Sequence, residues 1–487
     1  MLSTSQAAKQ LGVSPRRIRA LIESGDLQAE RIGNSWAIDE NSLNKRKRSP
    51  KLNGRPKHNE KDVTALKDYV LMNRNHEVAR FTFNVKQERV LSVFPCADSA
   101  WAPLGACSRP GQINADFLQE WIKNRTIPEA RPRIKEILSQ AGFINPSELA
   151  FSSLGLSLSD QYWFKPVDPS TNNPVNLDWH DINYFENGFE DTSGETQIVK
   201  TGSSSSFNRA PSNTTNGMLE KSWIAKEGKP YLIKGSSPGL GREPYCEVLA
   251  SRLYARLLDK DEYVPYELMI HDNKAYSICP DMLNETQELV PAAEIVSYFS
   301  LQRERSLYEA YVQNVSELIG KDERQTIDKM IVYDFLMSND DRHLFNFGLI
   351  REVESRQFIR VAPFYDQGCA FFARATIAQL RSSSFFYTSH PFAERPLAQL
   401  ALAQDYQWFD PAKLSGFTDE VADVLSQVED LSEEFIEHAV RHIDRNIDTV
   451  TEFATEALHA QQKIFVPEGL DGLFTTNEGI SLLNPSE

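Results

Sequence analysis

The chain has 487 residues, of which 41% are hydrophobic and 25% charged. This composition is typical of a soluble globular protein, and the length predicts about three domains. The absence of an apolar run of about 18 residues and of a signal sequence favours a cytoplasmic protein. The five cysteines form no C-x-x-C pair, so neither a zinc site nor a disulfide framework is predicted.

The charge is divided unevenly along the chain. The formal net charge is -16, yet residues 1–57 hold 12 Lys and Arg against 5 Asp and Glu, a balance of +7. The remaining residues hold 40 against 63, a balance of -23. Because an acidic body repels phosphates, this asymmetry predicts nucleic-acid contact at the N-terminal end only.

The N-terminal segment has the pattern of two short helices joined by a turn. Ser3 or Ser5 can cap the first helix, and Gly12 supplies the turn. Ser14 and Pro15 are a cap and a first helical position for the second helix. Recognition helices contact DNA through side chains near their start. The predicted DNA-binding residues are Arg16, Arg17 and Arg19.

A two-stranded wing is predicted next, where "AERIGNSWAI" turns at Gly33 and Asn34. With this wing, residues 1–45 resemble the excisionase and MerR-like winged helix-turn-helix domains, which implies DNA binding. The alternative is a helical hairpin that docks onto protein and keeps its arginines solvated. Residues 46–62 are basic and rich in Pro and Gly, and are expected to be a linker.

The following region, residues 63–185, is predicted to mix strands and helices. "VARFTFNV" and "RVLSVF" are strand-like, whereas "INADFLQEWIKN" and "RPRIKEILSQAG" are helical. A polar loop is expected at 191–222, and helices are expected at 325–338, 395–405 and 420–460. No chemistry is predicted in residues 63–150.

The segment "MSNDDRHLFNFGLI", residues 337–350, places polar side chains at the end of a predicted helix. Asp341 and Asn346 are separated by four residues, and Asp366 follows two apolar strands as Asp-Gln-Gly. This order is that of a protein-kinase catalytic loop, hairpin and D-x-G metal aspartate. Phosphoryl transfer needs a carboxylate near the acceptor hydroxyl and separate oxygen ligands for magnesium. We therefore predict Asp341 as the base or orienting group, and Asn346 and Asp366 as metal ligands.

The neighbours of Asp341 are given smaller roles. Asp340 is expected to belong to the loop without a catalytic part. Arg342 and His343 are expected to orient the loop through hydrogen bonds, and a catalytic part for His343 stays open.

A kinase site also needs a cation on an upstream strand, and Lys234 ends the strand-like "KPYLIK". The next predicted helix carries Glu243 in its first turn, where it is expected to pair with Lys234. Glu247 is the competing choice. The segment before the strand is predicted to bind the nucleotide phosphates through Ser212, Thr214, Thr215 and Gly217. The order of elements places the adenine-facing hinge at Cys279, Asp281 and Met282.

With these motifs, residues from about 150 to 450 resemble the HipA-like serine/threonine kinases, the toxin kinases of toxin–antitoxin systems. The resemblance is carried by "NDDRHLFNFGL" and "APFYDQG", with "LSLSDQYWFKP" and residues 179–185 upstream. It implies an α+β, two-lobed kinase fold, ATP and Mg²⁺ as cofactors, and transfer to Ser or Thr of a protein. It also implies an autophosphorylated serine in the nucleotide loop. The candidates are Ser203, Ser204, Ser205, Ser206 and Ser212.

The resemblance divides the body into an N-terminal α/β region at 63–185, a kinase N-lobe at 186–290 and a helical C-lobe at 291–465, with a tail at 466–487. Two departures from the family stand out. The nucleotide loop has no G-x-G-x-x-G, and a helix-turn-helix is fused to a kinase that usually has a separate DNA-binding antitoxin.

Two functions remain open at this point. The first is an active protein kinase with its own DNA-binding domain. The resemblance implies a protein substrate, which in some relatives is an aminoacyl-tRNA synthetase and which here could be that or another translation factor. The second is a transcription regulator whose kinase-like body senses a nucleotide or a partner. An antitoxin partner and a homodimer are further possibilities, and the sequence does not specify the substrate or the operator.

Overall fold

The computed structural model describes residues 2–465, apart from 12–13, 24–26, 33–34, 44–64, 110, 132–133, 190–209, 216–218, 238, 240, 383–384 and 386. The chain forms two compact units, residues 1–64 and residues 65–487, which we call the first unit and the second unit. The described residues form a mixed α+β fold, as predicted.

The described part of the first unit includes two short helices and a small antiparallel sheet in the order β1-β3-β2. Its elements are β1 Leu2–Ser3, α1 Thr4–Leu11, α2 Pro15–Glu23, β2 Ala29–Ile32 and β3 Ser35–Ile38. The predicted helices and strand pair are therefore confirmed. They enclose a core of Ala7, Ala8, Ile18, Leu21, Leu27, Ile38 and Leu43, because each helix turns one apolar face inward.

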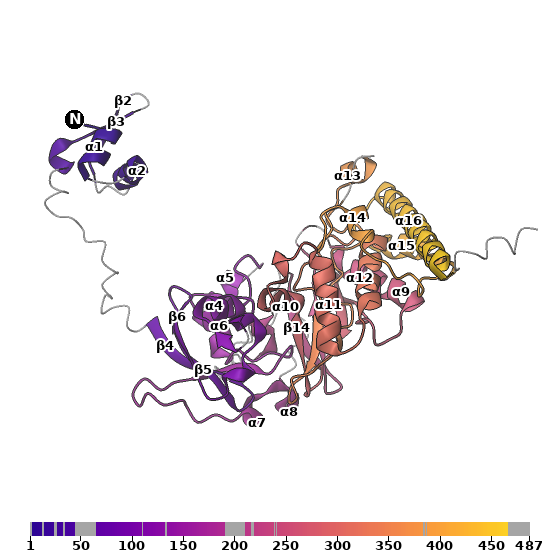
Figure 1. The fold of residues 1–487 in the computed structure, drawn as a ribbon, viewed down its shortest axis with the longest axis horizontal. Helices are drawn as coiled ribbons and strands as arrows, with labels where there is room; N and C mark the ends of the chain where they lie inside the picture. Colours follow the sequence, from indigo (N-terminus) through magenta and orange to yellow (C-terminus); the bar gives the residue numbers. More distant parts are fainter. Residues whose placement is uncertain are drawn as a thin grey trace, which may run out of the picture. The chain divides into compact units, whose positions relative to one another are not determined.

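A four-stranded antiparallel sheet in the order β6-β5-β4-β9 opens the second unit. Figure 1 labels its strands β4, β5 and β6. Its strands are β4 Leu66–Asn73, β5 His76–Asn84, β6 Arg89–Pro95 and β9 Tyr162–Pro166. The accompanying helices are α4 Ala115–Lys123, α5 Ile134–Ala141 and α6 Pro146–Ser152. Large aromatic side chains fill the core, among them Phe81, Phe83, Trp121, Phe151 and Phe164. The strands and helices predicted here are confirmed.

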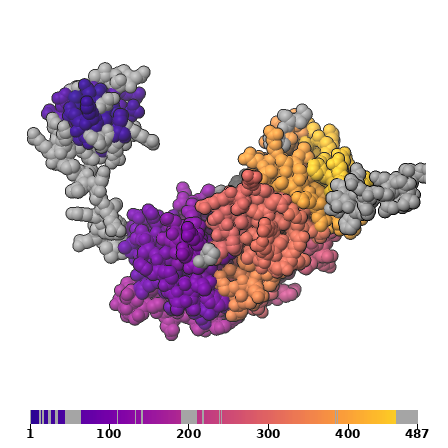
Figure 2. All heavy atoms as spheres, in the orientation of Figure 1, coloured from indigo at the N-terminus to yellow at the C-terminus, as the bar shows by residue number. Residues whose placement is uncertain are grey.

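The first part of the second unit packs against the rest of it, as Figure 2 shows for the purple and salmon segments. Gly105 donates its N–H to Glu294 Oε2 at 2.7 Å, and Arg351 donates to the hydroxyl of Tyr162 at 3.2 Å. Short elements complete this part: η2 Ser99–Trp101, η3 Leu104–Ala106, β7 Cys107–Arg109, β8 Gln112–Ile113, α7 Trp179–Ile182 and α8 Tyr184–Asn187.

A second four-stranded antiparallel sheet has the order β10-β11-β13-β12 and is covered by the helix α9. The bounds are η5 Pro211–Thr214, β10 Lys221–Lys226, β11 Lys229–Lys234, α9 Glu243–Leu257, β12 Glu267–His271 and β13 Lys274–Pro280. α9 is buried from Glu243 to Ser251, so the side chains of Glu243 and Glu247 lie in the protein interior. This places Lys234, at the end of β11, close to α9.

The remainder combines a three-stranded antiparallel sheet, β14-β15-β16, with helices. The strands are β14 Gln287–Pro291, β15 Gly348–Glu352 and β16 Phe358–Val361. The helical elements are α10 Ala292–Tyr298, η6 Leu301–Arg303, α11 Leu307–Ile319, α12 Arg324–Leu336, α13 Ile377–Arg381, α14 Pro396–Leu400, η7 Pro411–Leu414, α15 Phe417–Leu425 and α16 Glu433–Phe465. β15 and β16 are the two strands predicted between Asn346 and Asp366.

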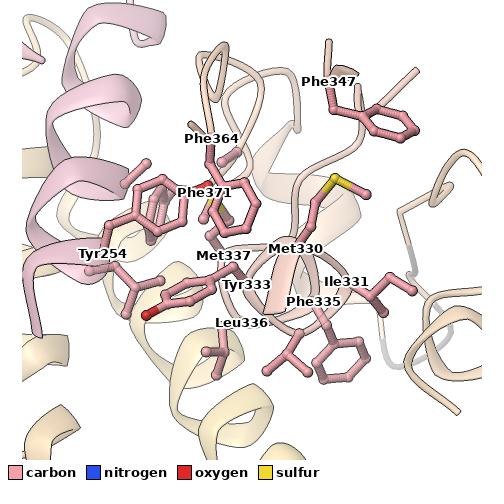
Figure 3. Close-up of a cluster of buried hydrophobic side chains, with 14 of the residues drawn as sticks. Tyr254, Met330, Ile331, Tyr333, Phe335, Leu336, Met337, Phe347, Phe364 and Phe371 are labelled. Atoms are coloured by element: carbon pink, nitrogen blue, oxygen red, sulfur yellow. The ribbon is translucent and has the colours of Figure 1, made fainter. Parts of the chain in front are cut away.

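The largest apolar core surrounds α12, whose residues from Met330 to Leu336 are all buried. Figure 3 shows Tyr333 of α12 beside Tyr254 of α9, with Phe364 nearby. The rings of Tyr254 and Tyr333 meet edge to face with their centroids 4.7 Å apart. These seven successive residues span about two helical turns, so this part of α12 is enclosed on every side and is a fixed support for the loop that follows it.

Two predicted helices differ from the structure. The segment 395–405 contains only the short α14, and 420–460 is divided between α15 and α16. The division falls where Asp430 adopts a left-handed conformation and the hydroxyl of Ser432 accepts the N–H of Phe435 at 3.2 Å. A serine in this position caps a new helix. None of the described helices combines the length and apolarity needed to cross a bilayer.

Candidate active site

The loop after α12 is anchored by the buried guanidinium of Arg342. It binds the carboxylate of Asp334 in α12, with Nε 2.9 Å from Oδ2. Its Nη1 donates to the carbonyls of both Asn346 and Tyr365, at 2.7 and 2.8 Å. Burial disfavours the charged guanidinium, but Asp334 outweighs this and raises the pKa of Arg342. Arg342 therefore joins the predicted catalytic loop to the residue that precedes Asp366.

Asp341 lies in this loop, and the loop is closed by side-chain bonds to its backbone. Asn346 donates from Nδ2 to the carbonyl of Asp341 at 2.8 Å, and Asn339 Oδ1 accepts the Asp341 N–H at 3.2 Å. Among the described residues, the partners of the Asp341 carboxylate are all at Oδ2. These partners are Cys369 Sγ at 3.6 Å and Arg374 Nη2 at 3.3 Å.

Asp366 lies at the centre of a charged cluster. Its backbone is left-handed, with a φ of 63°. Oδ1 is 2.7 Å from Lys234 Nζ, and Oδ2 is 3.7 Å from Lys221 Nζ. Burial by itself would raise the pKa of Asp366, but the two ammonium groups outweigh burial and hold the pKa below its usual range. Asp366 is thus held as a carboxylate.

The partner of Lys234 in α9 is Glu247. Lys234 Nζ is 2.7 Å from Glu247 Oε1 and donates to the hydroxyl of Tyr266 at 3.0 Å. Burial disfavours the ammonium group, but Asp366 and Glu247 outweigh it and raise the pKa of Lys234. Glu247 Oε2 also accepts the N–H of Gln367 at 2.9 Å. Glu247 therefore contacts both the lysine strand and the D-x-G turn.

The predicted pairing of Lys234 with Glu243 is wrong. Glu243 is the first residue of α9, and its Oε1 accepts the N–H of Ser237 at 3.2 Å. A carboxylate in the first turn is held by backbone N–H groups and by the positive end of the helix. Glu247, one turn further along the same face, is the residue that reaches Lys234.

Sequence reasoning missed Lys221. It lies on β10 directly opposite Lys234 on β11, and burial lowers its pKa. The signal was present in the hairpin "KSWIAKEGKPYLIK", where a turn at Glu227 and Gly228 brings the two terminal lysines into register. Two cations thus face Asp366.

The residues predicted to bind phosphates are engaged with protein groups. Ser212 Oγ accepts the N–H of Trp223 at 3.1 Å, and Thr214 Oγ1 donates to the carbonyl of Leu156 at 2.7 Å. Thr215 Oγ1 donates to the carbonyl of Ser212 at 2.8 Å and accepts from Arg131 at 3.0 Å. These hydroxyls bind other parts of the chain because η5 packs against α6 and β10. Gly217 and Ser203 to Ser206 lie outside the described residues.

The predicted hinge residues lie at and after the end of β13. Cys279 is buried in a small apolar cluster with Val264 and Tyr266, and Met282 packs against it. Asp281 Oδ1 accepts the N–H of Leu283 at 3.1 Å, and burial raises the pKa of Asp281 to about 7. Since Tyr266 contacts Lys234, this cluster adjoins the charged one.

The remaining predicted site residues are His343 and the DNA-binding arginines. His343 is exposed, and its Nδ1 accepts the N–H of Phe345 at 3.3 Å, so its described hydrogen bond is local to the loop. The predicted DNA-binding residues Arg16, Arg17 and Arg19 lie in α2 of the first unit. Arg19 is exposed, and the side chains of the other two lie outside the described residues.

The donor set near Asp366 suits magnesium better than a transition metal. No group of three or more His, Cys, Asp and Glu that fits a metal ion is found in the described part of the chain. Asp366 and Asn346 offer a carboxylate and an amide oxygen, and Arg342 holds the two segments together through its Nη1. Mg²⁺ is commonly held by few protein oxygens together with nucleotide phosphates.

Comparisons with known proteins give the most direct support to the helix-turn-helix prediction for the first unit. A family model described as a helix-turn-helix domain matches residues 1–49, so the chain carries such a domain at its N-terminus, which supports DNA binding. The comparison with curated proteins gave no match. Among solved structures, the chain is similar to the Helicobacter pylori proinflammatory kinase CtkA, at 17% identity and a TM-score of 0.37. That likeness covers 50% of this chain and 95% of CtkA, and at so low a TM-score it carries no argument.

Proposed function

We propose that the second unit is a HipA-like protein serine/threonine kinase that uses MgATP, and that the first unit binds DNA. One observation carries the kinase proposal: Lys234 is bonded at 2.7 Å both to Glu247 of α9 and to Asp366 of the D-x-G turn. Glu247 lies 13 residues after Lys234, whereas Asp366 lies 132 residues after it. A protein that needed only a stable core has little use for two buried charges bonded to a third that is 23% exposed, because burying charge is costly.

Each part of the reaction has a residue in a suitable place. Lys234 and Lys221 would bind the nucleotide phosphates once these displace Asp366 as their partner. Asn346 and Asp366 would hold Mg²⁺, which when bound would neutralise charge on the transferred phosphoryl group. The apolar cluster of Val264, Tyr266, Cys279, Leu232 and Met282 would accept the adenine ring.

Asp341 would orient the acceptor hydroxyl of a Ser or Thr side chain and take its proton. As the hydroxyl oxygen bonds to the γ-phosphorus, the bond from that phosphorus to the bridging oxygen breaks and ADP leaves. Oδ1 is the oxygen suited to this task, since the described contacts of the carboxylate are at Oδ2. An aminoacyl-tRNA synthetase or another translation factor is the substrate class that the family resemblance implies.

The test is incubation of the full chain with magnesium and ATP labelled in the γ-phosphate. Wild type is expected to label itself or an added protein, and Asp341→Ala is expected to lower the rate about 100-fold or more. Asp366→Ala should lose labelling as well, while Asp272→Ala, at a side chain 71% exposed, should keep it. Equal labelling of wild type and both site variants would contradict the proposal.

The labelled protein also tests the autophosphorylation candidates. Ser212 is 3% exposed, so its labelling requires η5 to open, and Ser203 to Ser206 are the remaining candidates. A phosphate in the predicted nucleotide loop would add negative charge that repels ATP. Mass spectrometry that finds phosphate only outside residues 200–222 would refute this part of the proposal.

A second function is favoured by one observation. The hydroxyls of Ser212, Thr214 and Thr215 are bound to protein groups, so they do not hold nucleotide phosphates for transfer in this arrangement. This favours a regulator whose kinase-like unit senses a nucleotide or a partner without catalysis. This function predicts ATP binding by calorimetry without any labelling in the experiment above. Labelling that depends on Asp341 would exclude it.

A further inference from the structure

The chain after the D-x-G motif makes a tight turn that ends at Arg374. Phe371 and Phe372 both have left-handed backbones, with φ of 50° and 62°. Residues with large side chains adopt this conformation only where their surroundings impose it. Both side chains are buried in the main core, and the Phe371 N–H donates to the carbonyl of Met337 at 2.7 Å. The turn is therefore firmly placed.

Arg374 faces the two adjacent aspartates of the loop. Its Nη2 is 3.3 Å from Asp341 Oδ2, and its Nη1 is 3.6 Å from Asp340 Oδ1. Asp340 Oδ1 is buried and makes no hydrogen bond among the described residues. Burial raises the pKa of Asp340 to about 6, and Arg374 acts against that rise. The Arg374 guanidinium thus contacts the carboxylates of both Asp340 and Asp341.

A side chain at the start of α9 also binds the backbone of this turn. Arg242, the residue before that helix, donates from Nη1 to the carbonyl of Ala375 at 2.8 Å. The same nitrogen is 3.5 Å from the carbonyls of Phe372 and Ala373. Because α9 also carries Glu247, the helix that positions Lys234 positions the turn of Arg374 as well.

We propose that Arg374 is a positioning residue for phosphoryl transfer, which holds the Asp341 carboxylate by Oδ2 and leaves Oδ1 for the acceptor hydroxyl. This inference rests on the proposed kinase function. Arg374 is expected to increase the rate of phosphoryl transfer, because it contacts only Oδ2 of Asp341 and leaves Oδ1 to accept the proton. An inhibitory contact would instead have to cover Oδ1, the oxygen that receives the proton.

The test compares the steady-state kinetics of Arg374→Ala, Arg374→Lys and Arg381→Ala. Loss of the guanidinium is expected to lower kcat about 10- to 100-fold, since small misplacements of a catalytic group cost up to about 100-fold. The KM for MgATP should stay near the wild-type value, because Lys234 and Asp366 do not contact Arg374. The lysine should restore part of kcat. Arg381, also exposed and paired with Glu434, is the matched control and should leave kcat unchanged.

A double variant tests the path through α9. If Arg242 acts by way of the turn, Arg242→Ala should lower kcat, and adding it to Arg374→Ala should lower kcat no further. Thermal melting of each variant verifies that it is folded.

Several outcomes would overturn the inference. An Arg374→Ala variant with wild-type or higher kcat would show that Arg374 does not help Asp341, while the kinase function would stand. A kcat loss that the lysine does not relieve, or that is matched in Arg381→Ala, would point to general destabilisation. If wild type labels no more than Asp341→Ala, the kinase function itself fails, and the inference fails with it.

Discussion

At the scale of single residues, the geometry of the site depends on which of two glutamates in α9 binds the ammonium group of Lys234. Glu243 and Glu247 are one helical turn apart in α9, and both are 1% exposed. Only Glu247 is within hydrogen-bond distance of the Lys234 ammonium group. One Glu243 oxygen, Oε2, is buried and has no hydrogen-bond partner among the described residues.

Glu247→Gln is expected to destabilise the protein more than Glu243→Gln does. Removing one partner of a buried ion pair costs about 3–5 kcal/mol, and the lower end is expected because Lys234 keeps Asp366. Glu243→Gln should change the free energy of unfolding by about 1 kcal/mol or less, since an amide oxygen still accepts the Ser237 N–H. Urea denaturation of both variants measures the difference. Equal losses would refute the assignment of Glu247 as the partner.

At the scale of elements, the first part of the second unit is joined to α10 through a partly buried carboxyl group. Glu294, in the first turn of α10, accepts the N–H of Gly105 in η3. A Cβ at Gly105 would lie 2.8 Å from Glu294 Cδ and 2.9 Å from Trp121 Cδ1, so the approach requires glycine. Burial raises the pKa of Glu294 from 4.5 to about 7.

This pKa predicts how stability changes with pH. Between pH 4.5 and about 7, Glu294 is ionised in the unfolded chain and protonated in the folded one, so rising pH favours unfolding. The loss from this group amounts to about 3 kcal/mol across the window. Glu294→Gln should make the free energy of unfolding depend less steeply on pH in this range. Glu317→Gln, at an exposed position, should leave that dependence unchanged. Urea denaturation at several pH values tests this, and parallel profiles for wild type and Glu294→Gln would contradict it.

At the scale of the whole molecule, the chain combines a basic helix-turn-helix unit with an acidic body. The balance of +7 in residues 1–57 against -23 elsewhere means that DNA is attracted to one end and repelled by the rest. Binding of this kind weakens with salt because it releases counterions from the phosphates. The two proposed activities should therefore be separable by substitution.

Arg16→Ala/Arg17→Ala is expected to weaken DNA binding and to keep phosphate labelling. If each arginine contacts a phosphate, the slope of log affinity against log salt should fall by about 2 in magnitude, or about 1 per contact. Gel shifts with the protein's own promoter at several salt concentrations measure this. Asp341→Ala should show the reverse pattern, with DNA binding intact. Unchanged DNA binding in the arginine variant would assign it to another surface, such as the basic residues 46–62.

Much of the fold and site was predictable because it depends on local patterns. Amphipathic periodicity predicted α4, α5 and α12, and strand-like runs predicted β5, β6, β15 and β16. The break between α15 and α16 was missed, although Ser432 is a visible cap, because helical periodicity continues on both sides of it.

The sequence by itself determined the identities and order of the groups: Asp341 and Asn346 on one loop, Asp366 after a hairpin, Lys234 at a strand end and the helix-turn-helix at the N-terminus. Spacing along a chain is a local property, and it was sufficient for these assignments. Only the tertiary structure decided that Glu247 binds Lys234, that Lys221 faces Asp366 and that Arg374 reaches Asp341. Those contacts join different elements of the fold. They depend on which face α9 turns toward β11 and on the left-handed turn at Phe371 and Phe372, which packing imposes.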